Sequence, residues 1–199
     1  MPGIEEISKT IRRHLDRKDA AREDALRISR QIIRECRNAV VCLQKGDTAR
    51  KNLTRAREMH RQLKRKLTGF PDLMLAGYAV DAAQELAEAE IFAACVCGRD
   101  LPSPAGIGVS DESYVLGMAD GVGEMRRLFL ARLMKGDNEA AAAILAQMEK
   151  FFDALMTFDY PDALIATKRK QDVARSLIEK CRSELAMATQ ISRLVGNLD

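Results

Sequence analysis

The chain has 199 residues, of which 47% are hydrophobic and 31% are charged, and its formal net charge is only +3. Aromatic residues make up 5%, tryptophan is absent and there are five prolines, a composition typical of an all-helical protein. No apolar run approaches the roughly 20 residues that span a bilayer, and the N-terminus is too charged for a signal peptide. We therefore expect a cytoplasmic protein with no membrane partner, folded as a single domain over residues 1–199.

Apolar residues recur at helical spacing along the chain and predict a bundle of about six or seven long helices. The first predicted helix covers the first 45 residues, with a break near 16–19. The second begins at a cap on Asp47 or Thr48 and ends near residue 67. The later predicted helices span 71–97, 111–134, 138–157 and 161–194. Two prolines and several glycines predict one long loop over residues 98–110.

The cysteines and histidines do not form a zinc-binding pattern. The five cysteines are an odd number in apolar helical segments, and only Cys95 and Cys97 are close in sequence, where a helix points them apart. The two histidines, His14 and His60, lie elsewhere. Buried, reduced thiols are the expected state.

The second predicted helix is strongly basic. Residues 50–66 contain eight Lys or Arg and one acidic residue, Glu58. Helical geometry places its cations on one side, namely Arg50, Arg57, Arg61, Lys64 and Arg65. The opposite side is apolar and consists of Leu53, Ala56, Met59, Leu63 and Leu67. A solvated surface is the simplest interpretation, but a face of one sign without acidic partners favours a polyanion, most simply a nucleic acid. The absence of aromatic residues from this face argues against sequence-specific base recognition.

Two pairs of carboxylates lie in segments that otherwise look buried. Glu85 and Glu88 share one helix face at spacing i, i+3, and Asp120 and Glu124 share another at i, i+4. Four carboxylates in an apolar setting need a divalent cation or protons in order to coexist. Because all the donors are oxygens, Mg²⁺ is the expected metal, with Mn²⁺ as an alternative. Such a site beside a cationic surface suits hydrolysis of a phosphodiester.

The same carboxylates could instead have a structural role. They could form ion pairs with Arg126, Arg127 or Arg132, or lie at a subunit interface. A ferritin-like di-iron site is excluded, because its Glu-x-x-His motif would need glutamates at residues 11 and 57. The helix over 111–134 also contains three glycines, which indicates a close approach of another backbone or a ligand: Gly117, Gly121 and Gly123.

The sequence resembles the translin family, and within it the branch of translin-associated factor X (TRAX). The resemblance rests on Gln84-Glu85-x-x-Glu88-Ala89, on the segment from Tyr114 to Arg127, and on Arg55-Ala56-Arg57-Glu58 in the basic helix. Segment order agrees with the family from about residue 4 to 195. The short length, without extended tails, resembles archaeal homologues.

The resemblance implies a bundle of seven helices that assembles into barrel-shaped octamers. Translin subunits bind single-stranded RNA and DNA, and TRAX subunits contain a Mg²⁺-dependent endoribonuclease site. The matching site residues here are Glu85, Glu88 and Asp120, with Glu124 as a fourth member of the site.

We therefore predict a homo-oligomeric, Mg²⁺-dependent endoribonuclease that cleaves single-stranded RNA. Glu85, Glu88 and Asp120 would hold the metal, and Glu124 would assist as a ligand or a base. The residues predicted to bind nucleic acid are Arg50, Arg55, Arg57, Arg61, Lys64, Arg65 and Arg127, the last near the scissile group. The main alternative is a scaffold that binds single-stranded RNA or DNA without cleaving it.

Overall fold

A computed structural model describes residues 3–196, and every regular element in this range is helical. The prediction of an all-α protein is thus confirmed. Six helices are long, and two, α3 and α5, have a single turn. Their bounds are α1 Ile4–Lys45, α2 Arg50–Leu67, α3 Pro71–Met74, α4 Gly77–Val96, α5 Pro104–Ile107, α6 Asp111–Leu133, α7 Asn138–Leu155 and α8 Lys168–Gly196. None of the described helices is long and apolar enough to cross a membrane.

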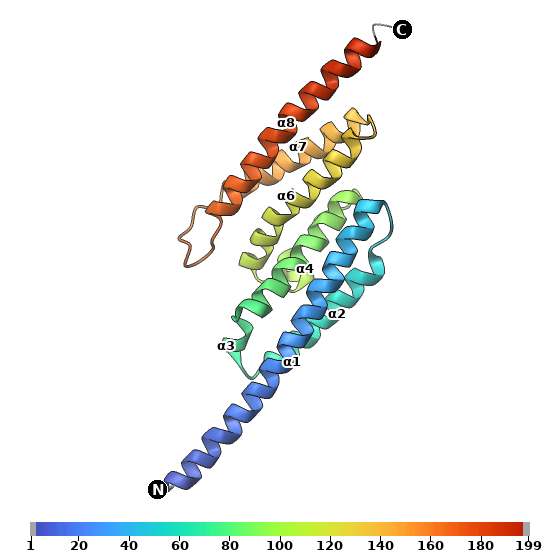
Figure 1. The fold of residues 1–199 in the computed structure, drawn as a ribbon. Helices are drawn as coiled ribbons and strands as arrows, with labels where there is room; N and C mark the ends of the chain where they lie inside the picture. The colour runs from blue at the N-terminus through green and yellow to red at the C-terminus, as the bar shows by residue number, and fades with distance from the viewer. Residues whose placement is uncertain (1–2, 197–199) are drawn as a thin grey trace.

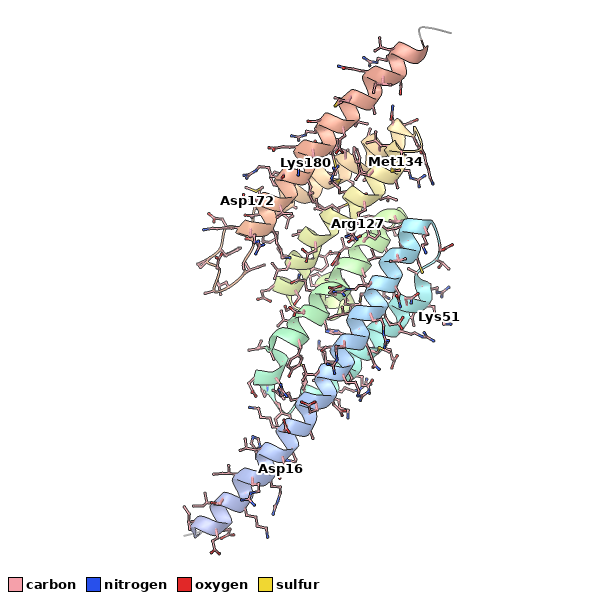
Figure 2. The ribbon with its side chains drawn as sticks, viewed as in Figure 1. Asp16, Lys51, Arg127, Met134, Asp172 and Lys180 are labelled. Atoms are coloured by element: carbon pink, nitrogen blue, oxygen red, sulfur yellow. The ribbon has the colours of Figure 1, made fainter. Side chains whose placement is uncertain are left out.

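The long helices form two groups that meet along α4 and α6 (Figure 1). Helices α1, α2 and α4 pack together on one side, and α6, α7 and α8 pack together on the other. The molecule is elongated because the first turns of α1 and the last turns of α8 extend past the bundle at opposite ends. Asp16 lies on the projecting part of α1 (Figure 2).

Helix α4 is the centre of the core because it has neighbours on several sides. Its apolar residues are buried nearly all round, as the sequence predicted, and the largest of them are Leu86, Ile91 and Phe92. Many of the remaining buried positions are alanines, which allow neighbouring helices to pack closely. One buried residue of α4, Glu90, is ionisable and is only 2% exposed.

The predicted break in the first helix is wrong. Helix α1 continues through residues 16–19, a stretch without Gly or Pro. Two contacts fasten this part of α1 to the segment after α2. Lys18 forms an ion pair of 2.6 Å with Asp72, and the ring of His14 lies 5.8 Å from that of Phe70. The helix ends where Gly46 takes a left-handed backbone with φ of 85°.

Several further helix boundaries differ from the prediction. The helix expected over 71–97 is divided into α3 and α4, because Ala76 has an extended backbone and stands as the N-cap of α4. The cap of α2 is Ala49. The cap of α6 is Ser110, whose Oγ accepts a hydrogen bond from the N–H of Ser113.

The last helix begins at Lys168 instead of near residue 161. Residues 161–167 form a tight connection that is tied to α7. Gln171 donates hydrogen bonds to the carbonyls of Leu155 and Phe158, at 2.8 and 3.1 Å, and Thr167 donates to the Phe158 carbonyl at 3.3 Å. These bonds fix the first turn of α8 against the bundle. All five cysteines are free. The expectation of buried thiols is confirmed for Cys36 and Cys181, whereas Cys42 and Cys95 are half-buried and Cys97 is exposed.

Candidate metal centre and nucleic-acid interface

The packing of α4 on α6 brings the four predicted carboxylates together. Glu85, Glu88 and Glu124 line one hollow of about 330 Å³, which α1 closes on its third side. Asp120 lies close enough to act electrostatically on Glu88. Residues from two segments about 35 positions apart therefore form one acidic cluster, as the sequence predicted.

Gly117 makes this approach of the two helices possible. A Cβ atom at this position would lie 2.7 Å from the carbonyl oxygen of Gln84, 2.8 Å from the amide nitrogen of Glu88 and 2.9 Å from the Cβ of Ala87. The predicted close backbone approach is thus confirmed at Gly117. The remaining two glycines do not share this role, since a Cβ at Gly121 would meet only an ordinary contact at 3.9 Å and one at Gly123 would meet nothing within 4 Å.

Three of the four carboxylates have a cationic partner, each from a different helix. Arg37 of α1 donates to Glu85 at 3.3 Å, and Arg127 of α6 lies 3.0 Å from Glu124. Lys170 of α8 donates to Asp120 at 2.5 Å. Figure 2 shows Arg127 on the stretch of α6 that lies beside α4.

Two glutamines complete these contacts. Gln84 donates to the second carboxylate oxygen of Asp120 at 2.6 Å, and Gln44 donates to Glu124 at 2.7 Å. Of the arginines predicted as structural partners, only Arg127 contacts the cluster. Arg126 forms a bidentate pair with Glu184, and Arg132 lies 3.8 Å from Asp137.

Glu88 is the exception, because no hydrogen bond or ion pair reaches its carboxylate from residues 3–196. Burial raises the pKa of Glu88 to about 8, and the charges of Asp120, Glu85 and Glu124 contribute in the same direction. Burial also raises the pKa of Glu124, although Arg127 and Gln44 oppose that shift. The cluster thus contains one carboxyl group that tends to keep its proton and lacks a counter-charge.

The chemistry of this cluster fits a hard divalent cation. All four donors are carboxylates, and Glu88 is a half-buried donor that no hydrogen bond or ion pair from residues 3–196 reaches. In the described residues, however, no three acidic, His or Cys side chains stand in a geometry that could hold a metal ion. The side chains are instead turned toward Arg37, Lys170 and Arg127. Metal binding would thus require these side chains to turn, while the helices already hold them in reach of one another.

The cationic residues of α2 lie on its outer face, and its apolar residues face inward, as predicted. Leu53, Ala56, Leu63 and Leu67 are buried. Two details were not predicted. Met59 is only half-buried, and His60 is buried with a pKa lowered to about 4, chiefly by the loss of hydration and further by Lys64.

The exposed cations of α2 are not all equally available. Arg57 forms a bidentate ion pair with the buried Glu90 of α4, although 45% of its own side chain is exposed. Arg61 pairs with its neighbour Glu58 at 3.2 Å, and Lys64 donates to the carbonyl of Gly108 at 3.0 Å. Arg57 therefore has a structural role besides any contact with nucleic acid.

A second hollow, of about 730 Å³, lies beside this basic face. Arg50 and Arg57 of α2 line it together with Arg99, which follows the end of α4, and the hydroxyl residues Thr48 and Thr54. Three guanidinium groups and two hydroxyls around an open hollow are suited to phosphate oxygens. Sequence reasoning missed Arg99, because it stands alone in a loop with no basic neighbour.

The two hollows lie on different sides of α4. Glu88 faces α6, whereas Glu90, two residues later and about 200° round the helix, faces Arg57 on α2. Within one chain, the arginines that line the acidic hollow are therefore Arg37 and Arg127. Sequence reasoning missed Arg37, Lys170 and Gln44, because these partners lie some 50 to 80 residues from the carboxylates that they contact.

A model of the Translin family matches residues 20–184 of this chain. The chain belongs to the translin family. MJ0175, an uncharacterized protein of Methanocaldococcus jannaschii, is 31% identical over 98% of this chain and 88% of its own length. Both the acidic cluster and the whole of the basic helix lie within the matched family region.

Solved structures give the same result for the fold. AfC3PO, solved alone and in a complex with duplex RNA, superposes with a TM-score of 0.84 in both cases at 31% identity. The match covers 94% of this chain and 97–98% of AfC3PO. Apo-NeC3PO superposes with a TM-score of 0.76 at 19% identity, over 94% of this chain and 98% of its own, and supports the fold alone.

Proposed function

We propose that this translin-family protein is a metal-dependent endoribonuclease. The proposal rests on the cluster of four carboxylates from α4 and α6 around a hollow that two arginines also line. Glu85, Glu88 and Asp120 would hold Mg²⁺ or Mn²⁺, and Glu124 would act as a further ligand or as a base. When bound, the ion would polarise a phosphoryl oxygen and lower the pKa of a water molecule.

The surrounding side chains would prepare the reacting groups. Arg37 and Arg127 have exposed side chains beside the carboxylates, so their guanidinium groups can turn toward a phosphodiester and neutralise it. Glu124, whose pKa is raised by burial, could accept a proton from the attacking water. The presence of the full carboxylate set favours the TRAX-like assignment within the family.

RNA is the proposed substrate, and the comparison with AfC3PO supports this choice because that relative has been solved with duplex RNA. The sequence led us to expect single-stranded RNA, with single-stranded DNA as a further ligand. The basic residues of α2 and the hollow lined by Arg50, Arg57 and Arg99 would follow the phosphate backbone. Single-stranded RNA and duplex RNA should therefore both be tested as substrates.

We also propose a homo-oligomer, expected to be a barrel-shaped octamer. The projecting ends of α1 and α8 support assembly, because each leaves a row of apolar residues exposed. On α1 these are Ile4, Ile7, Ile11 and Leu15, and on α8 they are Met187, Ile191 and Leu194. A cytoplasmic location stays a prediction.

The second candidate is an RNA-binding scaffold without catalysis. The ion pairs of Glu85, Asp120 and Glu124 favour this candidate, since they give three of the carboxylates a structural role.

One assay separates the two candidates. Purified protein is incubated with labelled single-stranded and duplex RNA in Mg²⁺, in Mn²⁺ and in EDTA, alongside the variant Asp120→Asn. A nuclease gives metal-dependent cleavage that the variant lacks, at unchanged RNA affinity. Binding that weakens steeply with salt but never leads to cleavage would favour the scaffold. The absence of RNA binding at low salt would refute both candidates.

A further inference from the structure

Lys170 is a cation of α8 that contacts the acidic cluster. It lies in the first turn of α8, and its Nζ donates to Oδ1 of Asp120 at 2.5 Å. The second oxygen of Asp120 accepts from Gln84 at 2.6 Å, so both oxygens of this carboxylate are occupied. The charge of Lys170 also acts on Glu88, on which it has the opposite effect to the neighbouring carboxylates.

The position of Lys170 is more restrained than that of the two arginines at the cluster. The side chains of Arg37 and Arg127 are 70% and 69% exposed, whereas that of Lys170 is 28% exposed. Its backbone is also held, because the adjacent Gln171 is bonded to the carbonyls at the end of α7. The ammonium group can therefore leave Asp120 only if its own side chain turns.

A divalent cation and the Lys170 ammonium group cannot share Asp120 without cost. Magnesium needs its oxygen ligands at about 2.1 Å, and a second positive charge on the same oxygen would repel the ion. Without a metal, the ammonium group supplies the positive charge that pairs with Asp120, as Arg37 and Arg127 do for Glu85 and Glu124.

We propose that Lys170 is a built-in competitor for the metal: it holds Asp120 while the site is free of metal and must withdraw when a divalent cation binds. This inference rests on the proposed metal site. It assigns to Lys170 a positioning role that sets the affinity of the site for metal.

The experiment compares Mn²⁺ binding and thermal stability in the full-length wild type and three variants. Lys170→Met removes the charge and keeps most of the stem, and Lys170→Arg keeps the charge. Lys180→Met is the matched control, because Lys180 is an exposed lysine on the same helix, away from the cluster (Figure 2). Mn²⁺ affinity is measured by isothermal titration calorimetry, and melting is measured in EDTA and in excess Mn²⁺.

We expect Lys170→Met to bind Mn²⁺ more tightly, by up to about fivefold, since a partly exposed ion pair is worth up to about 1 kcal/mol. In EDTA the same variant should melt below the wild type, and Mn²⁺ should raise its melting temperature by more than it raises that of the wild type. Lys170→Arg and Lys180→Met should resemble the wild type in affinity.

Equal or weaker Mn²⁺ binding by a folded Lys170→Met would overturn the inference while leaving the metal site intact. If neither the wild type nor Lys170→Met binds Mn²⁺, the metal site and the competition are both refuted. If the wild type fails to bind and Lys170→Met binds, the competition is supported in its strongest form. Cleavage of RNA is not needed for any of these outcomes, so the nuclease proposal is judged separately.

Discussion

The backbone of Gly117 on α6 lies directly against the carbonyl of Gln84 on α4, where a Cβ atom would stand only 2.7 Å from the oxygen. The same Gln84 donates through its side chain to Asp120, three residues beyond Gly117. This close backbone contact between the two helix groups therefore lies within one turn of Asp120, one of the residues proposed to bind metal. The fold and the site depend on the same small residue.

Substituting Gly117 with alanine should destabilise the protein. In an open helix the change would gain up to about 1 kcal/mol, but here the new methyl group meets backbone atoms that cannot turn aside. We expect a net loss of about 1–3 kcal/mol, measured as a melting temperature several degrees below that of the wild type. Gly123→Ala is the control, because its Cβ would meet nothing within 4 Å, and it should melt at or above the wild type. A Gly117→Ala variant as stable as Gly123→Ala would contradict the packing described here.

The raised pKa of Glu88 predicts that the metal-free protein loses stability as the pH rises. The folded protein keeps the Glu88 proton up to about pH 8, whereas the unfolded chain releases it near the ordinary value of 4.5. Between these two values the folded state binds more protons, so stability falls as the pH rises through the window and the loss is complete above it. Melting in EDTA from pH 5 to 9 measures this effect.

Glu88→Gln is the reference for that measurement, because it removes the titrating group and leaves the rest of the cluster. As the pH rises, the melting temperature of the wild type should fall relative to that of this variant. His60, with its lowered pKa, acts in the opposite sense below about pH 6.5, but it is present in both proteins and cancels from the difference. A difference that does not change with pH would rule out a protonated Glu88.

Arg57 and Arg61 should differ in their effect on stability. Removing Arg57 leaves the carboxylate of Glu90, which is 2% exposed, without its bidentate partner, and we expect this to cost about 1–3 kcal/mol. Arg61→Ala breaks a pair between two exposed residues and should cost under about 0.5 kcal/mol. Urea unfolding gives both values. The double change Arg57→Met with Glu90→Leu should recover part of the loss. If the variant without Arg57 is as stable as Arg61→Ala, the Arg57–Glu90 pair is not structural.

Arg99 should contribute to RNA binding although it is remote from the basic helix in sequence. Arg99→Ala should weaken binding about threefold at moderate salt and reduce the slope of log affinity against log salt by about one. Lys150→Ala provides the comparison, because Lys150 is an exposed cation on α7, across α6 from this hollow. Fluorescence anisotropy with labelled single-stranded and duplex RNA gives both quantities. If the two variants bind alike, the hollow beside α2 is not on the RNA path.

Many helix ends could be predicted because local chemistry decides them. Gly46 ends α1 and Ser110 begins α6. The loop predicted over 98–110 is correct only in part, because it contains the one-turn helix α5, which Ser103 caps and Pro104 begins. The boundaries that failed depend on distant contacts. Residues 161–167 avoid a helix because Thr167 and Gln171 bond to carbonyls at the end of α7, and no local pattern encodes those partners.

The helical class, the inward face of α2 and the two carboxylate pairs could be predicted from the chain, because each is a matter of spacing along one helix. The cations that pair with those carboxylates could not be predicted in this way. Arg37 and Lys170 reach Glu85 and Asp120 across 48 and 50 residues, and Glu88 is left without a partner, because the positions of α1, α4, α6 and α8 are set by packing of the whole bundle. Coulomb interactions depend on distance in space, so only the folded chain distinguishes a paired carboxylate from one that is free to bind a metal.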